Sequence, residues 1–329
     1  LSIVNYSTKI NKKLKLKDFK NKIYFLKKNP DLVPYVTSYY KKDWGFCMNY
    51  KTFKKLNPKD KYHLSIDSNF KKGSIDIGVK FLRGKSKKTF LISSYLCHPS
   101  MANNELSGPL TLLGLYQKLK SQKNKYSYII VINPETIGSI CFLHQFDNFL
   151  KKYLISGMVI TCTGGPKNKL SYKLSKNQNS LLNKFYENLN KHNLINLRKF
   201  DASEGSDERQ YCSPGFNFPI GQISRTVYGT YKEYHTSGDN KKFMKINKIE
   251  SSVEEIFKHL KLFEKIHPLK RKMPFCELQL GKRNLYPNIN FRLFTEKYSK
   301  EKFLRNILNI LSYADGKNTI LDIANILNV

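Results

Sequence analysis

The chain has 329 residues, long enough for one large domain and a smaller one. Hydrophobic residues make up 40% of it and aromatic residues 13%, which allows a packed core and excludes wholesale disorder. It contains no apolar run of about 18 residues, so we expect no membrane span. The net charge of +33 could serve nucleic-acid binding. The lysines are spread along the chain rather than gathered in one arm, however, so nucleic acid is not the partner that we expect.

Six cysteines are scattered through the sequence without a CxxC pair. Several lie in apolar stretches, a pattern typical of free buried thiols in a reducing compartment rather than of a disulfide framework. We therefore predict a cytoplasmic location. The chain starts at Leu1 rather than at a methionine and stops abruptly at Val329, so we expect that neither end is natural.

Residues 1–87 are expected to form an N-terminal region with a small β-rich insert. Leu1–Asn29 is rich in lysine and predicts a surface helix or an irregular wrap. Asp31–Tyr50 is dense in aromatic residues and predicts either a small aromatic core or one wall of a substrate cleft. Two segments of alternating polarity, Lys61–Asp67 and Ser74–Phe81, predict a small hairpin or subdomain.

A repeating pattern of strand and helix occupies residues 88–268. Short apolar runs predict strands at Lys88–Leu96, Tyr126–Ile132, Leu154–Cys162 and Pro219–Ser224. Apolar residues at helical spacing predict helices at Ser107–Ser121, Thr136–Phe146, Asn177–His192 and Ile246–Ile266. Strands that alternate with helices predict an α/β fold with helices on both faces of the sheet.

Residues 269–329 lack this pattern and are expected to form a separate, partial domain. Two segments of helical spacing, Lys302–Leu311 and Thr319–Leu327, flank a predicted turn at Asp315–Lys317, as in helix-turn-helix units. The second segment contains no Lys or Arg to contact phosphates. A helical module for docking, or for forming an oligomer, is therefore the preferred alternative to DNA binding.

The stretch Leu91–Gly108 indicates where the chemistry lies. An apolar strand ends in Cys97-His98-Pro99, so His98 is expected at the carboxyl edge of the sheet, where ligands bind in open α/β sheets. We predict that His98 is a metal ligand; a histidine that only hydrogen-bonds at a strand end is the alternative. A catalytic pair of Cys97 and His98 is not expected, because adjacent residues on a strand point to opposite faces.

Two further stretches carry candidate ligands. Glu135 follows the buried strand Tyr126–Ile132, and His235 lies in a loop rich in Gly, Tyr and Thr. An acidic cluster precedes that loop and consists of Glu204, Asp207 and Glu208. Two histidines and a carboxylate from separate loops are what a tetrahedral zinc site needs, and a second carboxylate can act as general base.

The segments CHPSMANNELSG, PETIGS, GSDERQYCSPG and YHTSGD, in this order, resemble the aminopeptidase-like proteins of bacterial surface-polysaccharide gene clusters. Those proteins belong to the wider zinc aminopeptidase and glutaminyl cyclase superfamily. The resemblance covers roughly Pro34–Pro268. It implies a three-layer mixed sheet with helices on both faces. The C-terminal piece is similar to the winged helix often appended in this family, here truncated.

Carried over to this sequence, the resemblance implies metal ligands at His98 and His235 and a catalytic role for Glu135. One zinc ion on the two histidines would be completed by Glu135 or Asp207. Asn104 is a further candidate metal ligand, because it stands where active relatives have an aspartate that bridges two metal ions, although a neutral amide is a poor bridge.

Two more positions depart from the pattern of the family. Pro134 precedes Glu135 where relatives usually have a second glutamate, and the strand Val159–Thr163 ends without the aspartate that relatives place there. We therefore expect one zinc ion rather than two. Glu105, next to Asn104, is either a substitute carboxylate or an acid that favours a helix N-terminus.

Glu208, Arg209 and Tyr234 flank the acidic and histidine loops and are expected to contact the substrate, with ordinary packing and surface pairing as the alternative. The resemblance implies a zinc-dependent hydrolase that cleaves an amide bond in a small amino-acyl or acylamino-sugar substrate of surface-polysaccharide biosynthesis. Two alternatives stay open: a catalytically degenerate binding or scaffold protein, and a nucleic-acid-binding regulator.

Overall fold

The computed structural model describes residues 1–286 and 299–328 and divides the chain into two compact units, Leu1–Phe257 and Lys258–Val329. The domain limits expected at 87/88 and 268/269 stay predictions. Residues 287–298 and 329 of the expected C-terminal domain lie outside the described residues. Among the helices that are described, none combines the length and the apolar character that a bilayer crossing requires.

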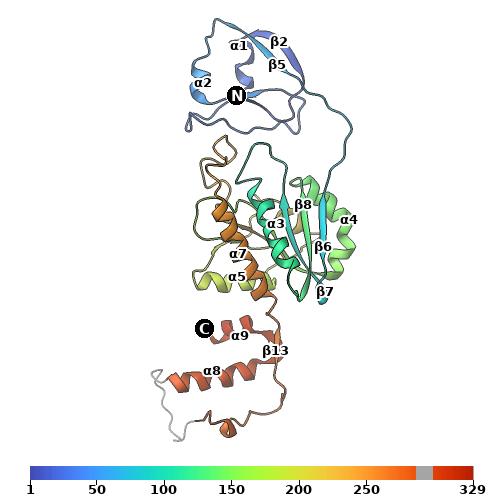
Figure 1. Ribbon diagram of the computed structural model, residues 1–329, viewed down its shortest axis with the longest axis vertical. Helices are drawn as coiled ribbons and strands as arrows, with labels where there is room; N and C mark the ends of the chain where they lie inside the picture. The colour runs from blue at the N-terminus through green and yellow to red at the C-terminus, as the bar shows by residue number, and fades with distance from the viewer. Residues whose placement is uncertain (287–298, 329) are drawn as a thin grey trace. The chain divides into compact units, whose positions relative to one another are not determined.

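The first unit is built on a large mixed sheet (Figure 1). Within residues 1–286 its seven strands lie in the order β11 (Asn196–Arg198), β10 (Ser171–Lys173), β12 (Ile220–Ser224), β9 (Leu154–Ile160), β7 (Ser86–Tyr95), β8 (Tyr126–Asn133) and β6 (Gly78–Leu82). The four strands from β12 to β8 run parallel, whereas β10 and β6 are antiparallel to their neighbours β12 and β8. Leu91, Ile129 and Val159 at its centre are fully buried, as expected for parallel strands covered on both faces.

Helices cover both faces of this sheet. The connection from β7 to β8 contains α3 (Ser107–Lys120), and the connection from β8 to β9 contains α4 (Ile137–Tyr153). These two crossovers run in opposite directions along the sheet, so right-handed connections place α3 and α4 on opposite faces (Figure 1). The first part of α7 (Ile246–Phe263) lies along α3, where Lys118 Nζ pairs with Glu254 Oε1 at 2.7 Å. The predicted three-layer α/β fold is thus confirmed. The shorter helices of this part are α5 (Leu181–Lys191) and α6 (Glu208–Tyr211).

The predicted hairpin of two adjacent segments is wrong. β5 (Lys61–Ile66) pairs with β2 (Ile10–Lys15), and β6 instead forms the edge of the large sheet beside β8. The alternating apolar residues of β6 face α4. Phe81, for example, packs against Phe149 of this helix, with their ring centroids 5.4 Å apart. Alternation predicted the strand but could not show what it pairs with.

The N-terminal residues form a small β-rich part with its own apolar cluster. A three-stranded sheet contains β1 (Ser2–Ile3), β4 (Phe46–Cys47) and β3 (Ile23–Tyr24), and the short helices are α1 (Leu16–Phe19), η1 (Lys20–Lys22) and α2 (Tyr50–Lys54). Leu16, Phe19 and Phe46 are buried in the cluster. The expectation of a surface helix or irregular wrap over Leu1–Asn29 is therefore wrong. The lysine-rich segment Ile10–Lys15 is the strand β2, with Ile10 buried and Leu14 partly buried.

The second unit combines helices with a two-stranded sheet. Its described elements are β13 (Pro268–Lys270), η2 (Gly281–Arg283), α8 (Ser299–Tyr313), β14 (Asp315–Thr319) and α9 (Ile320–Leu327). β14 pairs with β13, so the turn expected at Asp315–Lys317 is instead part of a strand. Thr319 starts α9 with a capping box, because its side chain accepts from Asp322 N while the Asp322 carboxylate accepts from Thr319 N.

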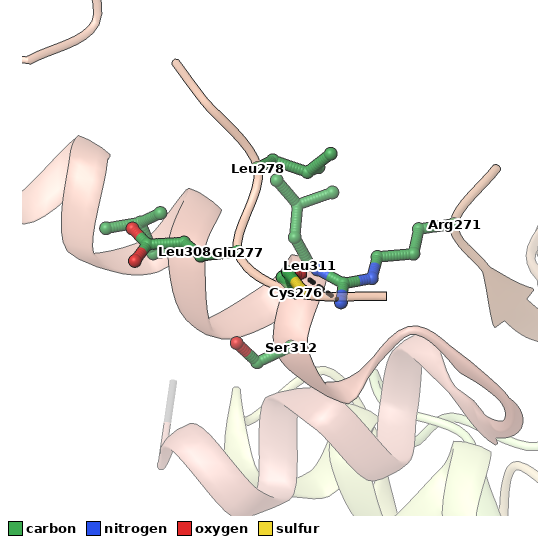
Figure 2. A pocket seen from close by; sticks show the side chains of 7 residues that line it. All are labelled: Arg271, Cys276, Glu277, Leu278, Leu308, Leu311 and Ser312. Atoms are coloured by element: carbon green, nitrogen blue, oxygen red, sulfur yellow. Dashed lines mark hydrogen bonds between the residues drawn. The ribbon is translucent and has the colours of Figure 1, made fainter. Parts of the chain in front are cut away.

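A pocket of about 350 Å³ lies within the second unit (Figure 2). It is lined by Arg271, Cys276, Glu277, Leu278, Leu308, Leu311 and Ser312. Nη2 of Arg271 donates to the carbonyl oxygens of Pro274 at 2.8 Å and Cys276 at 2.7 Å, and Figure 2 draws the bond to Cys276 as a dashed line. These two bonds give Arg271 a structural role, because they hold the backbone of the segment that lines the pocket.

Candidate metal centre

The loop that follows β7 folds back on itself. After Leu96 N donates to Asn133 O at 3.0 Å, the chain leaves the sheet and Cys97 N donates to Glu105 Oε2 at 2.6 Å. The far end of the loop is held by the Asp239 carboxylate, which accepts from the backbone N–H of residue 103 at 2.6 Å and of residue 104 at 2.9 Å. These bonds bring Glu105 next to the residues that end the strand.

His98 is the centre of a group of metal-binding side chains. Its Nδ1 contacts Glu105 Oε1 and lies 3.3 Å from Cys97 Sγ. Its Nε2 lies 3.7 Å from Glu135 Oε2, beyond the end of β8. The ligand atoms of Cys97, His98 and Glu105 all lie within 4.8 Å of one another. Thiolate, imidazole and carboxylate are the ligand types that bind zinc in proteins.

His235 reaches the same place from a distant loop. Its ring centroid lies 5.2 Å from that of His98, and the ring of Tyr234 stacks on it at 3.9 Å. Tyr35, from the N-terminal part, lies 5.3 Å from both histidine rings. Of the two interpretations of the aromatic stretch, the small aromatic core is confirmed by Phe46. The wall of a substrate cleft stays a prediction, which the position of Tyr35 beside the histidines supports.

Burial and neighbouring charges shift three groups at this site. Burial alone would lower the pKa of His98, but Cys97 and Glu105 outweigh it and raise the pKa to about 10. Burial, helped by the charge of His98, lowers the pKa of His235 to about 4. Burial raises the pKa of Glu135 to about 7. In the metal-free chain at neutral pH His235 is thus a neutral imidazole, the form that binds metals, whereas His98 is protonated and has to release a proton to bind one. Glu135 can both take up and release a proton.

The buried polar atoms of the loop fit a cation. Glu105 is 1% exposed, and its Oε1 accepts no hydrogen bond of regular geometry from the described residues, although it contacts His98 Nδ1. A buried carboxylate needs a cation or donor beside it, which in the metal-free chain is the protonated His98 and which a metal ion can replace. Together with the neighbouring nitrogen and sulfur atoms, this carboxylate is suited to zinc.

Asp207 hydrogen-bonds to the loop that follows β8. It is fully buried and accepts from Thr136 N at 2.7 Å, from Asn133 Nδ2 at 2.9 Å and from Ser139 Oγ at 3.0 Å. Its carboxylate therefore fixes the segment that carries Glu135. Among the described residues it is not part of the ligand group formed by Cys97, His98 and Glu105.

The three side chains predicted to contact substrate lie in different surroundings. Glu208 is buried and pairs with Lys173 Nζ at 3.0 Å, and Arg209 Nε donates to Ser206 O at 3.2 Å. Of the three, Tyr234 is the one whose ring stacks on a candidate ligand, His235.

The expectation that the side chains of Cys97 and His98 point to opposite faces is wrong. β7 ends at Tyr95, so both residues lie beyond the strand and the alternation of a pleated strand no longer applies to them. Sequence reasoning therefore missed Cys97, whose position beside His98 was the available signal. It also missed Tyr35, which no spacing in the sequence connects to either histidine.

Comparisons with known proteins agree with this architecture. The family described as "Domain of unknown function (DUF4910)" matches residues 21–266, and the family described as "winged helix-turn-helix" matches residues 267–329. A Clostridium acetobutylicum protein is 36% identical over 327 residues, which is 98% of this chain and 73% of that protein. It is provisionally named a polysaccharide biosynthesis protein with an aminopeptidase-like domain.

Two solved structures are similar in fold. The crystal structure of a provisionally named peptidase from Clostridium acetobutylicum has a TM-score of 0.84 at 33% identity, covering 100% of this chain and 73% of its own. BSAP, a zinc aminopeptidase from Bacillus subtilis, has a TM-score of 0.56 at 13% identity, covering 73% of this chain and 63% of its own. The second similarity concerns the fold alone. The aminopeptidase-like fold and the C-terminal winged helix are thus confirmed.

Proposed function

Because the chain belongs to the DUF4910 family and has an aminopeptidase-like fold, we propose that it is a peptidase-like hydrolase that cleaves an amide bond with one zinc ion. One observation carries the proposal: His98, His235, Glu105 and Glu135 meet beyond the carboxyl ends of β7 and β8. Ligands of open α/β sheets bind at this edge.

Each side chain has a role that its surroundings support. His98, His235 and Oε1 of Glu105 would hold the ion. When bound, zinc acts as a Lewis acid that polarises the amide carbonyl. Glu135, with its pKa raised to about 7 by burial, accepts a proton from the attacking water and returns it to the leaving amine.

The surroundings of Asn104 support a single ion rather than a pair. Its Nδ2 donates to the Tyr95 hydroxyl at 3.2 Å and lies 3.7 Å from Cys162 Sγ. The residues directly after β9 are Thr161, Cys162 and Thr163, none of which offers a carboxylate. A second zinc ion would thus lack the anionic ligands that it needs.

The walls of the site favour a small substrate with both apolar and polar faces. Tyr35 and Tyr234 flank the two histidines, and tyrosine rings offer apolar faces with a hydroxyl at one edge. We propose a small amino-acyl or acylamino-sugar substrate. The name of the Clostridium relative, which refers to polysaccharide biosynthesis, supports this class.

Elemental analysis of the purified chain tests the proposal first. We expect about one zinc ion per chain, loss of zinc in His98→Ala and in His235→Ala, and no loss in the control His144→Ala, which removes an exposed histidine of α4. Unchanged zinc in both variants would overturn the proposal. If zinc is bound, Glu135→Gln should keep the metal but abolish hydrolysis of amide substrates.

A degenerate binding protein is the second candidate. Asn104 favours it, because the Oδ1 atom of this residue is buried without a hydrogen-bond donor among the described residues and its amide cannot bridge metal ions. On this alternative the chain binds zinc or a ligand at the same site but hydrolyses no amide, and Glu135→Gln leaves ligand affinity unchanged.

A further inference from the structure

One polar atom of the site has no part in the roles described above, the sulfur of Cys97. It lies 3.3 Å from His98 Nδ1, and it belongs with His98 and Glu105 to the group whose donor atoms lie within 4.8 Å of one another. Nitrogen, oxygen and sulfur ligands of a tetrahedral zinc ion are roughly 3.5 Å apart, given metal–ligand distances of about 2.0–2.3 Å. The sulfur is thus at the distance from His98 Nδ1 that a shared ion requires, whereas Glu105 Oε1 lies closer to this nitrogen and has to move away from it when an ion binds between them.

The backbone holds the sulfur in this position. Cys97 N donates to Glu105 Oε2 at 2.6 Å, and Glu135 N donates to Cys97 Sγ at an N···S distance of 3.3 Å. Metal ligands in proteins are commonly oriented by such additional hydrogen bonds. Cys97 is also a free, exposed cysteine, so an ion can reach it from solvent.

The buried carboxylate of Glu105 gives independent support for a metal ion at this position. The side chain of Glu105 is 1% exposed, and among the described residues its Oε1 contacts His98 Nδ1 without regular hydrogen-bond geometry. A buried carboxylate, an imidazole nitrogen and a thiol thus lie together, and these are ligand types that one zinc ion binds.

We infer that Cys97 is a thiolate ligand of the zinc ion, so that the site combines thiolate, imidazole and carboxylate donors. This inference rests on the proposed single-zinc function and extends it by one ligand. Binding the ion transfers the thiol proton of Cys97 to solvent. The thiolate makes the site select zinc over magnesium, calcium or manganese, which prefer oxygen ligands.

Cobalt substitution tests the ligand directly. A cobalt–thiolate bond gives a strong near-ultraviolet charge-transfer absorption that cobalt with only nitrogen and oxygen ligands lacks. We would load the metal-free full chain with Co²⁺ and compare Cys97→Ser with Cys141→Ser, which removes another free, exposed thiol. We expect the absorption in the wild type and in Cys141→Ser. In Cys97→Ser it should be lost, with at least about tenfold weaker cobalt binding.

A second measurement uses the wild-type chain alone and so does not depend on the folding of a variant. Iodoacetamide labelling is quantified by mass spectrometry at Cys97 and Cys141, with and without zinc. Zinc should slow labelling of Cys97 by at least about tenfold, because only a free thiolate reacts readily, and should leave Cys141 unchanged.

The results separate this inference from the proposal on which it rests. Cobalt that binds without the thiolate absorption, with Cys97 still labelled at full rate, would overturn the thiolate ligand and leave the single-zinc site intact. A wild-type chain that binds neither cobalt nor zinc would overturn both.

Discussion

Tyr35 and His235 are joined through both backbone and side chain. Tyr35 N donates to His235 O at 2.8 Å, and the two rings meet edge to face at a centroid distance of 5.3 Å. His235 has a φ of 51°, in the left-handed region that non-glycine residues adopt uncommonly. The neighbouring bridge of Pro34 with Thr236 adds a second tie. The N-terminal part thus helps to set the orientation of a candidate ligand.

Replacing Tyr35 should therefore loosen both histidines. We expect Tyr35→Ala to weaken zinc binding by about 10–100-fold, the usual effect of losing a residue that orients a ligand, while Tyr35→Phe keeps near wild-type affinity because it retains the ring. Competition with a chelator of known affinity measures this. Tyr40→Ala, at a side chain 97% exposed, is the control. Equal affinities in all three variants would mean that Tyr35 does not position the site.

Replacing Asp239 should lower both the stability of the fold and the affinity of the site for zinc. Its carboxylate accepts from the N–H groups of Asn103 and Asn104. In Asp239→Asn the side chain keeps one oxygen acceptor, so one of the two N–H groups faces an NH₂ group and loses its hydrogen bond. We therefore expect the free energy of unfolding to fall by about 1–3 kcal/mol and zinc binding to weaken. Urea unfolding measures the first effect, with the exposed Asp67→Asn as control. A destabilised variant with unchanged zinc affinity would show that Asp239 does not act through the loop that carries Glu105.

Much of this arrangement could be predicted from the sequence, because the signals were local. The apolar runs of β7, β8 and β9 predicted strands, and proline or polar residues after them placed His98 and Glu135 at the carboxyl edge of the sheet. The partner of β6 could not be predicted, because alternation defines a strand and not its neighbour. Tyr35 could not be predicted either, since its contact with His235 joins segments far apart in the chain and follows no spacing rule.

The buried pair of Lys173 and Glu208 should contribute to folding rather than to the site. Both side chains are almost fully buried, with Nζ and Oε1 3.0 Å apart, and Lys173 also donates to the carbonyl oxygens of Asp201 and Glu204. Removing one partner leaves a buried charge unpaired, so Lys173→Met or Glu208→Gln should each cost about 3–5 kcal/mol.

A double-mutant cycle separates pairing from other effects. The variant with both substitutions should lose clearly less than the sum of the two single losses, because no unpaired charge remains. Zinc affinity of the folded fraction of Glu208→Gln should equal that of the wild type. Weaker zinc or substrate binding in this variant would instead support the substrate contact predicted from the sequence.

Asp207 should make the stability of the chain depend on pH, and the direction of its pKa shift fixes the expected sign. Burial raises its pKa to about 6 in spite of three hydrogen bonds, whereas the usual value is 3.8. The folded state therefore holds this proton more tightly than the unfolded state does. The stabilisation is fully present below about pH 4 and is lost as the pH rises to about 6. Since one pKa unit corresponds to about 1.4 kcal/mol, the change amounts to up to about 3 kcal/mol.

The difference in unfolding free energy between Asp207→Asn and the wild type isolates this contribution. The substitution removes the titrating group. The unfolding free energy of the variant relative to that of the wild type should therefore rise between about pH 4 and 6 and stay constant above about pH 6. Urea unfolding at a series of pH values measures it, with Asp76→Asn, an exposed carboxylate, as the control for general charge effects. A difference that moves in favour of the wild type as the pH rises would mean that the hydrogen bonds from Thr136, Ser139 and Asn133 outweigh burial. Asp207 would then stabilise the fold as a carboxylate.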